Sequence, residues 1–175
     1  VLSYIAIHKE DRAGMITFAE KPDTYIKASR RTNQIQLLLE SLYSQQTTFG
    51  ETDFSSLCVL LSQHAVRRSL MIIYTNFTSL SSMNRQLDYL IQLSHSHRVL
   101  VVFFEDSEVN EYVTERSQSM EDYYKHVIAE KTIYEKRLIV STLLRHGIYS
   151  LLTTPQHLSV DVINKYLEMK ARQMF

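Results

Sequence analysis

Short apolar runs separated by amphipathic stretches cover most of this chain. Four of these runs are too short for helices and predict strands, at residues 13–19, 69–75, 98–105 and 147–152. A β-branched and aromatic segment at 24–28 follows a polar turn at 21–23 and predicts a hairpin with the first strand. The run at 98–105 is almost unbroken, which is typical of a parallel strand covered on both faces.

Apolar residues that recur at intervals of three and four predict helices at 1–9, 32–43, 52–66, 83–96, 120–146 and 159–174. Thr52 and Ser159 suit the N-caps of two of these helices. The side chains expected to face the core are Ile35, Leu38, Leu39 and Leu42, then Phe54, Leu57, Cys58 and Leu61, then Leu87, Leu90 and Ile91, then Tyr123, Tyr124, Val127, Tyr134 and Leu138, and finally Val160, Ile163, Leu167 and Ala171.

Strands that alternate with helices predict an α/β fold, a three-layer, doubly wound and mostly parallel sheet with helices on both faces. A length of 175 residues suits a single domain over 1–175. Ligands of such sheets bind at the carboxyl ends of the strands. Because the chain starts at Val1 rather than Met, we interpret it as an N-terminally truncated fragment of a longer protein.

The charge balance and the cysteine count exclude several classes of protein. Lys and Arg number 19, as do Asp and Glu, and a general nucleic-acid binder would need a basic excess. The single cysteine, Cys58, excludes an intramolecular disulfide and a cysteine-based zinc site. No apolar run approaches the roughly 18 residues of a membrane span. The pairs Arg30–Arg31 and Arg67–Arg68 are expected to be solvated helix and strand ends unless the fold brings them together.

Candidate chemistry is sparse. The chain has no glycine-rich phosphate loop and no GxSxG nucleophile elbow, and its histidines are scattered. Oxygen-bearing side chains gather at the predicted ligand end of the sheet, in Glu51, Thr52, Asp53, Thr75 and Asn76. Hard cations such as Mg²⁺ prefer these ligands. The alternative is structural, with Thr52 as a helix cap, Asp53 in the first turn, and Thr75 and Asn76 in a plain turn.

Four segments carry a resemblance to a known family. They are GETDF at 50–54, RRSLMIIYTNF at 67–77, VLVVFFED at 99–106 and HLSVDVINKYLEMKAR at 157–172. Together they resemble the C-terminal half of the domain-of-unknown-function 58 family, over essentially the whole chain. The resemblance implies a von Willebrand factor A-like domain that lacks its first central strand. It also implies a non-catalytic protein–protein interaction domain associated with MoxR-type AAA+ ATPases in assembly or chaperone-like roles.

The same resemblance implies a degenerate metal-ion-dependent adhesion site. Thr52 matches the second-loop threonine of that site, and Asn76 stands where the family pattern has an aspartate. The Asp-x-Ser-x-Ser loop is expected upstream of Val1, so Mg²⁺ is expected only in the intact protein and no cofactor in this fragment. Membrane helices are common upstream in the family, which implies a membrane-anchored parent with this part as a soluble, cytoplasmic-side domain.

Two questions stay open at the level of sequence. The alternative function is a hydrolase or phosphotransfer enzyme, with acid–base residues sought among Glu51, Asp53, Glu105 and Asp106. A fold without its central strand leaves strand edges unpaired. The hairpin is expected to move beside the strand at 69–75, or a second copy to pair there as a homodimer. The remaining possibility is a hairpin folded elsewhere.

Overall fold

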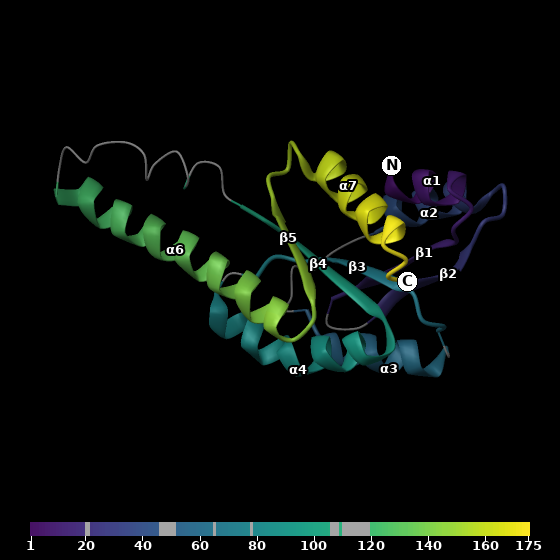
Figure 1. Cartoon of the computed structure of the whole chain (residues 1–175), viewed down its shortest axis with the longest axis horizontal. Coiled ribbons are helices and arrows are strands. Elements are labelled where there is room, and N and C mark those ends of the chain that lie inside the picture. Colours follow the sequence, from purple (N-terminus) through teal and green to yellow (C-terminus); the bar gives the residue numbers. More distant parts are fainter. Residues whose placement is uncertain (20–21, 46–51, 65, 78, 106–108, 110–119) are drawn as a thin grey trace. The chain divides into compact units, whose positions relative to one another are not determined.

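The computed structural model describes residues 1–19, 22–45, 52–64, 66–77, 79–105, 109 and 120–175. These residues form two compact units, Val1–Val66 and Arg67–Phe175. The prediction of a single domain over 1–175 stays a prediction. The described elements follow the expected alternation of helices and strands (Figure 1).

The first unit is a β-hairpin with three helices. Its elements are α1 (Leu2–His8), β1 (Ala13–Phe18), β2 (Pro22–Ser29), α2 (Gln34–Tyr43) and α3 (Phe54–Gln63). The predicted hairpin is confirmed, since β1 and β2 pair antiparallel. The predicted turn at 21–23 is wrong at its end, because β2 already begins at Pro22. A proline is tolerated at the first residue of a strand, where its missing N–H matters least.

A β-bulge shapes this hairpin. Ala13 pairs with Ser29 and Met15 with Ile26, so β2 has one more residue than β1 between these two pairs. Gly14 lies opposite, where an added Cβ would stand 2.6 Å from the carbonyl oxygen of Ile26 and 2.7 Å from the amide nitrogen of Ala28. The two backbones therefore approach each other so closely that only glycine fits between them.

Gln34 fastens α2 to both strands at the bulge. Its Nε2 donates to the carbonyl oxygens of Ala13 at 2.8 Å and Lys27 at 3.0 Å, and the residue is only 4% exposed. The inward face of α2 is therefore set by Gln34 and Leu38. The prediction that Leu39 and Leu42 face the core is wrong, since both are exposed.

The second unit carries a three-stranded parallel sheet. Its elements are β3 (Leu70–Tyr74), α4 (Leu80–Ser96), β4 (Arg98–Phe104), α6 (Met120–Arg145), β5 (Tyr149–Thr153) and α7 (Leu158–Ala171). The strand order is β3-β4-β5, with every pair parallel. Figure 1 shows α4 and α6 on one face of the sheet and α7 on the other. The α/β class is thus confirmed for this unit.

β4 is the centre of this core. Its residues 99–103 are buried, as the unbroken apolar run predicts, because strands and helices cover it on every side. β3, predicted as a buried strand, is mostly half-buried, since it lies at the edge of the sheet. Among the described strands, none pairs with the outer edge of β3.

The hairpin forms a sheet of its own, so the predicted closure of the β3 edge by the first strand is wrong. β1 and β2 pair with each other, and the hydrogen bonds of Gln34 at the bulge hold the hairpin to α2 within its own unit. The homodimer stays a prediction. Of the three alternatives, only pairing of the hairpin with β3 is contradicted by the described strands.

Helix faces were predicted with mixed success. The α3 residues Phe54, Leu57, Cys58 and Leu61 are buried, as predicted. In α7 the buried residues are Val162, Tyr166 and Met169, whereas the predicted Val160, Leu167 and Ala171 are exposed. Both sets recur at helical intervals, and the packing of α7 against β5 selects one of them.

The face of α6 is also reversed. Its buried residues are Ala129, Ile139 and Leu143, whereas the predicted inward residues Tyr123, Tyr124, Val127 and Tyr134 are exposed. At about 100° per residue, the buried set and the exposed set lie on opposite sides of the helix. α6 therefore has two apolar faces, and its contacts with β5 and α4 bury only one of them.

Candidate functional site

The predicted oxygen cluster is divided between the two units. Thr52 and Asp53 precede α3 in the first unit, and Thr75 and Asn76 follow β3 in the second. Glu51 lies outside the described residues. Thr52 is half-buried and Asn76 is exposed. The expected proximity of the Thr52 hydroxyl to the Asn76 amide therefore stays a prediction, as does the metal site built on it.

Asp53, and not Thr52, is the N-cap of α3. Its Oδ1 accepts hydrogen bonds from the amide of Ser55 at 2.8 Å and from the Ser55 hydroxyl at 2.7 Å. Its Oδ2 accepts from the amide of Ser56 at 3.3 Å and from the Ser56 hydroxyl at 2.5 Å. The prediction that Thr52 caps the helix is wrong, because an aspartate one residue later reaches the first free amides and brings a charge that suits the helix dipole.

These bonds also explain the acidity of Asp53. The hydroxyls of Ser55 and Ser56 are the main causes that lower its pKa from 3.8 to about 2. Its backbone N–H donates to the carbonyl oxygen of Ala19 at 2.9 Å, which joins the start of α3 to the end of β1. The geometry thus gives Asp53 a structural role at this helix end.

Acidic and imidazole side chains do not converge on a metal position within the described ranges. No group of three His, Cys, Asp or Glu residues among them could hold a metal ion. Cys58 is buried, and burial raises the pKa of its thiol. The thiol therefore stays protonated at neutral pH and suits a core position.

The carboxyl end of the parallel sheet carries a small cavity of about 280 Å³. Glu105, Lys136 and Arg137 supply its charges, and Lys136 Nζ donates to the carbonyl oxygen of Phe104. Beside it, the buried Thr153 donates through Oγ1 to Asp161 Oδ2 at 2.5 Å. Among the described lining residues there is one carboxylate and no histidine, so no acid–base pair gathers there. Asp106 lies outside the described residues.

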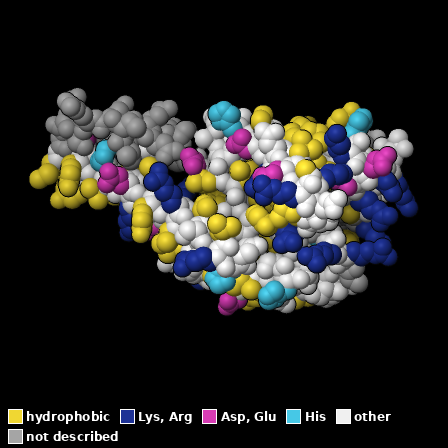
Figure 2. Space-filling view, viewed as in Figure 1, with side chains coloured by type: hydrophobic (Ala, Val, Ile, Leu, Met, Phe, Trp, Pro, Cys, Tyr) yellow, Lys and Arg dark blue, Asp and Glu magenta, His cyan; other side chains and the backbone are white. Residues whose placement is uncertain are grey.

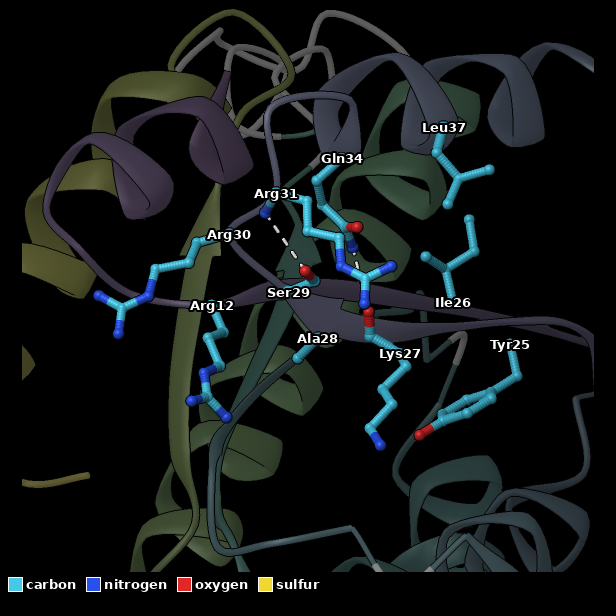
Figure 3. Close-up of a pocket in the computed structure, with 10 residues that line it drawn as sticks. All are labelled: Arg12, Tyr25, Ile26, Lys27, Ala28, Ser29, Arg30, Arg31, Gln34 and Leu37. Atoms are coloured by element: carbon cyan, nitrogen blue, oxygen red, sulfur yellow. Dashed lines mark hydrogen bonds between the residues drawn. The ribbon is translucent and has the colours of Figure 1, made fainter.

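A larger and more basic cavity lies on the first unit, with a volume of about 700 Å³ (Figure 3). We name it the hairpin pocket. It is lined by Arg12, Tyr25, Ile26, Lys27, Ala28, Ser29, Arg30, Arg31, Gln34 and Leu37. Four of these ten side chains are cationic and none is acidic.

The four cationic residues of the hairpin pocket are exposed. Arg30 Nη1 donates to the carbonyl oxygen of Glu10 at 3.3 Å. Within the described part of the chain, none of Arg12, Lys27, Arg30 and Arg31 forms an ion pair with a carboxylate. Among the described residues, the pocket therefore presents positive charge that is not paired with a carboxylate.

Sequence analysis identified two of the four cationic residues of this pocket. The pair Arg30 and Arg31 was singled out, but its predicted partner would have been the pair at 67–68, which belongs to the other unit. Arg12 and Lys27 were missed, because only the register of β1 on β2 brings the residue before one strand to the end of the other. The pairing of residues 13 and 29 is the signal that reveals the cluster.

Comparison with protein-family models, curated proteins and solved structures gives no match to this chain. A search for membrane-spanning segments among the described helices finds none that is both long and apolar enough.

Proposed function

We propose that this chain is a non-catalytic protein–protein interaction domain of the von Willebrand A-like kind, which serves a MoxR-type AAA+ ATPase in assembly. The observation that carries the proposal is a row of exposed apolar side chains along α6, named here the α6 stripe. Its members are Met120, Tyr123, Tyr124, Val127, Ile128 and Tyr134.

The α6 stripe has the geometry of a contact face. Successive members are separated by three, one, three, one and six residues, which places all six within an arc of about 140° on the helix. Each of them is at least 45% exposed. Figure 1 shows the N-terminal half of α6 extending beyond the sheet of its unit, and Figure 2 shows hydrophobic side chains at that end.

The composition of the stripe favours a protein partner. Contiguous apolar patches of this kind are rare on surfaces without a partner. Tyrosine and methionine are enriched in protein interfaces, where a flat ring buries a large area at a small entropic cost. The parallel sheet with helices on both faces supports the wider architectural part of the proposal. Under the proposal, Thr52 and Asn76 would belong to an incomplete metal site that could hold Mg²⁺ only in the intact protein.

The enzyme alternative finds less support. Of its candidate residues, Asp53 is engaged as a helix cap. Glu105 lines the cavity at the end of the parallel sheet, and the described lining of that cavity holds no further carboxylate and no histidine. No specific observation favours a hydrolase or phosphotransfer reaction over the interaction domain.

The experiment measures binding of the full-length protein to a purified MoxR-type ATPase by biolayer interferometry, with and without Mg²⁺. The test variant is Tyr123→Ser with Tyr124→Ser, which removes two aromatic rings from the stripe. The control is Tyr43→Ser, which removes a ring that is 89% exposed on α2. We expect the stripe variant to lose about tenfold or more in affinity, because two interface aromatics are each worth more than about 1 kcal/mol. Equal affinity of all three proteins, or no binding by the unchanged protein, would contradict the proposal.

A further inference from the structure

We infer that the hairpin pocket binds an acidic, extended peptide segment of a protein partner, which adds to the free edge of β2 as a third strand. The inference rests on the proposed function, since it assumes a protein partner, and it names the chemistry of one segment of that partner. It depends on a different surface from the α6 stripe.

Charge is the first argument. Arg12, Lys27, Arg30 and Arg31 surround a cavity that has no acidic lining residue. The cost of holding such cations together falls when carboxylates enter, and guanidinium groups bind carboxylates through two parallel hydrogen bonds. Figure 2 shows Lys and Arg side chains gathered over the end of the view where Figure 1 labels β1 and β2. The chain as a whole is neutral, so this concentration is local.

The strand edge is the second argument. β2 pairs with β1 on one side only, and no described strand occupies its other side. A two-stranded sheet is marginal alone and gains backbone hydrogen bonds from a third strand. The bulge at Lys27 and Ala28 bends this edge, and Gln34 Nε2 donates a hydrogen bond to the Lys27 carbonyl oxygen there. The pocket follows this edge, since five consecutive β2 residues and the next two residues line it.

The two sides of the edge differ in chemistry, which predicts the pattern of the peptide. In Figure 3, Arg12 and Lys27 extend to one side of the hairpin ribbon, whereas Ile26 and Leu37 lie on the other side together with the guanidinium of Arg31. Side chains of an added strand alternate between the two sides. Acidic residues at every second position would therefore meet Arg12 and Lys27, and apolar residues between them would meet Ile26 and Leu37.

A nucleic acid fits the pocket less well. Single-stranded nucleic acids need open aromatic faces on which bases stack. The only aromatic lining residue among those described is Tyr25, and its ring already packs on the His64 ring at a centroid distance of 4.1 Å.

The test measures fluorescence anisotropy of a labelled peptide of four Glu-Val repeats with the full chain. The test variant is Arg12→Glu with Lys27→Glu, and the matched control is Arg67→Glu with Arg68→Glu, a basic pair in the other unit. We expect the test variant to bind at least about tenfold more weakly and the control to bind like the unchanged chain, since each lost charge-assisted hydrogen bond is worth about a factor of ten. Leu37→Ser, at an exposed position, should weaken binding without a change in charge.

Several results would overturn the inference. The first is that the test variant binds the Glu-Val peptide as tightly as the unchanged chain does. The second is that the Glu-Val peptide does not bind the unchanged chain, or that a peptide of four Lys-Val repeats binds it equally well. The third is that an oligouridylate binds the unchanged chain more tightly than the Glu-Val peptide and loses this binding in the Arg12→Glu, Lys27→Glu variant. The last result would assign the pocket to RNA. If the ATPase still binds through the α6 stripe in such a case, the proposed function stands and only this inference fails.

Discussion

Replacing Asp53 tests whether this residue is a helix cap or part of a metal site. Asp53→Ala removes the acceptor for the amides of Ser55 and Ser56, which are the first free N–H groups of α3. Loss of an N-cap costs about 0.5–2 kcal/mol, and loss of a carboxylate at a helix N-terminus about 0.3–1 kcal/mol. We therefore expect the free energy of unfolding to fall by about 2 kcal/mol.

Asp53→Asn separates the two contributions. Asparagine caps helices about as well as aspartate but carries no charge, so its cost should be no more than about 1 kcal/mol. The measurement is urea unfolding at pH 7 followed by far-ultraviolet circular dichroism, with amide hydrogen exchange of Ser55 and Ser56 as the local readout. Exchange at these two amides should accelerate in Asp53→Ala more than in Asp53→Asn.

The pH dependence and the effect of Mg²⁺ complete the test. Because the folded pKa of Asp53 is lowered from 3.8 to about 2, its stabilising contribution is complete above pH 3.8 and is lost as the pH falls through 2. Asp53→Asn should lack this loss. A ligand that binds only the folded chain raises its stability. If Mg²⁺ stabilises the unchanged chain but not Asp53→Asn, or if Asp53→Ala costs nothing, our assignment of Asp53 as a cap is refuted.

Three further predictions concern other positions. Gly14→Ala should cost about 1–3 kcal/mol in thermal unfolding because its Cβ meets backbone atoms, and Gly14→Asn should be worse still. Gly147 has a φ of +73°, and a Cβ added there would meet nothing within 4 Å, so Gly147→Asn should cost less stability than Gly147→Ala. If Asn and Ala ranked in the same order of stability at both glycines, this reasoning would be contradicted. Burial lowers the pKa of His97 below 6.5, so its stabilising contribution, measured by urea unfolding, should be fully present above pH 6.5 and be lost as the pH falls through the folded pKa. A His97→Gln variant whose stability has the same pH profile as the unchanged chain would contradict this prediction. Thr153→Val should cost about 1–3 kcal/mol by removing the donor to Asp161, and a neutral result by urea unfolding would show that water replaces it.

Several elements could be predicted from the sequence because their signals are local. β4 is an unbroken apolar run, and its burial follows from composition alone. The hairpin follows from two short β-rich segments joined closely along the chain. The inward face of α3 follows from a single row of apolar residues, since that helix offers no competing row.

Tertiary structure decided what these local patterns leave open. α6 and α7 each carry two apolar rows with correct helical spacing. Contact with β5, and for α6 also with α4, determines which row is buried. The cap of α3 could be Thr52 or Asp53 by composition, and the backbone geometry at the helix start selects Asp53. The hairpin pocket depends on strand register, because Arg12 and Lys27 become neighbours only when β1 and β2 pair around the bulge opposite Gly14. Periodicity reports which faces are able to pack, whereas burial and proximity depend on partners that lie far away in the chain.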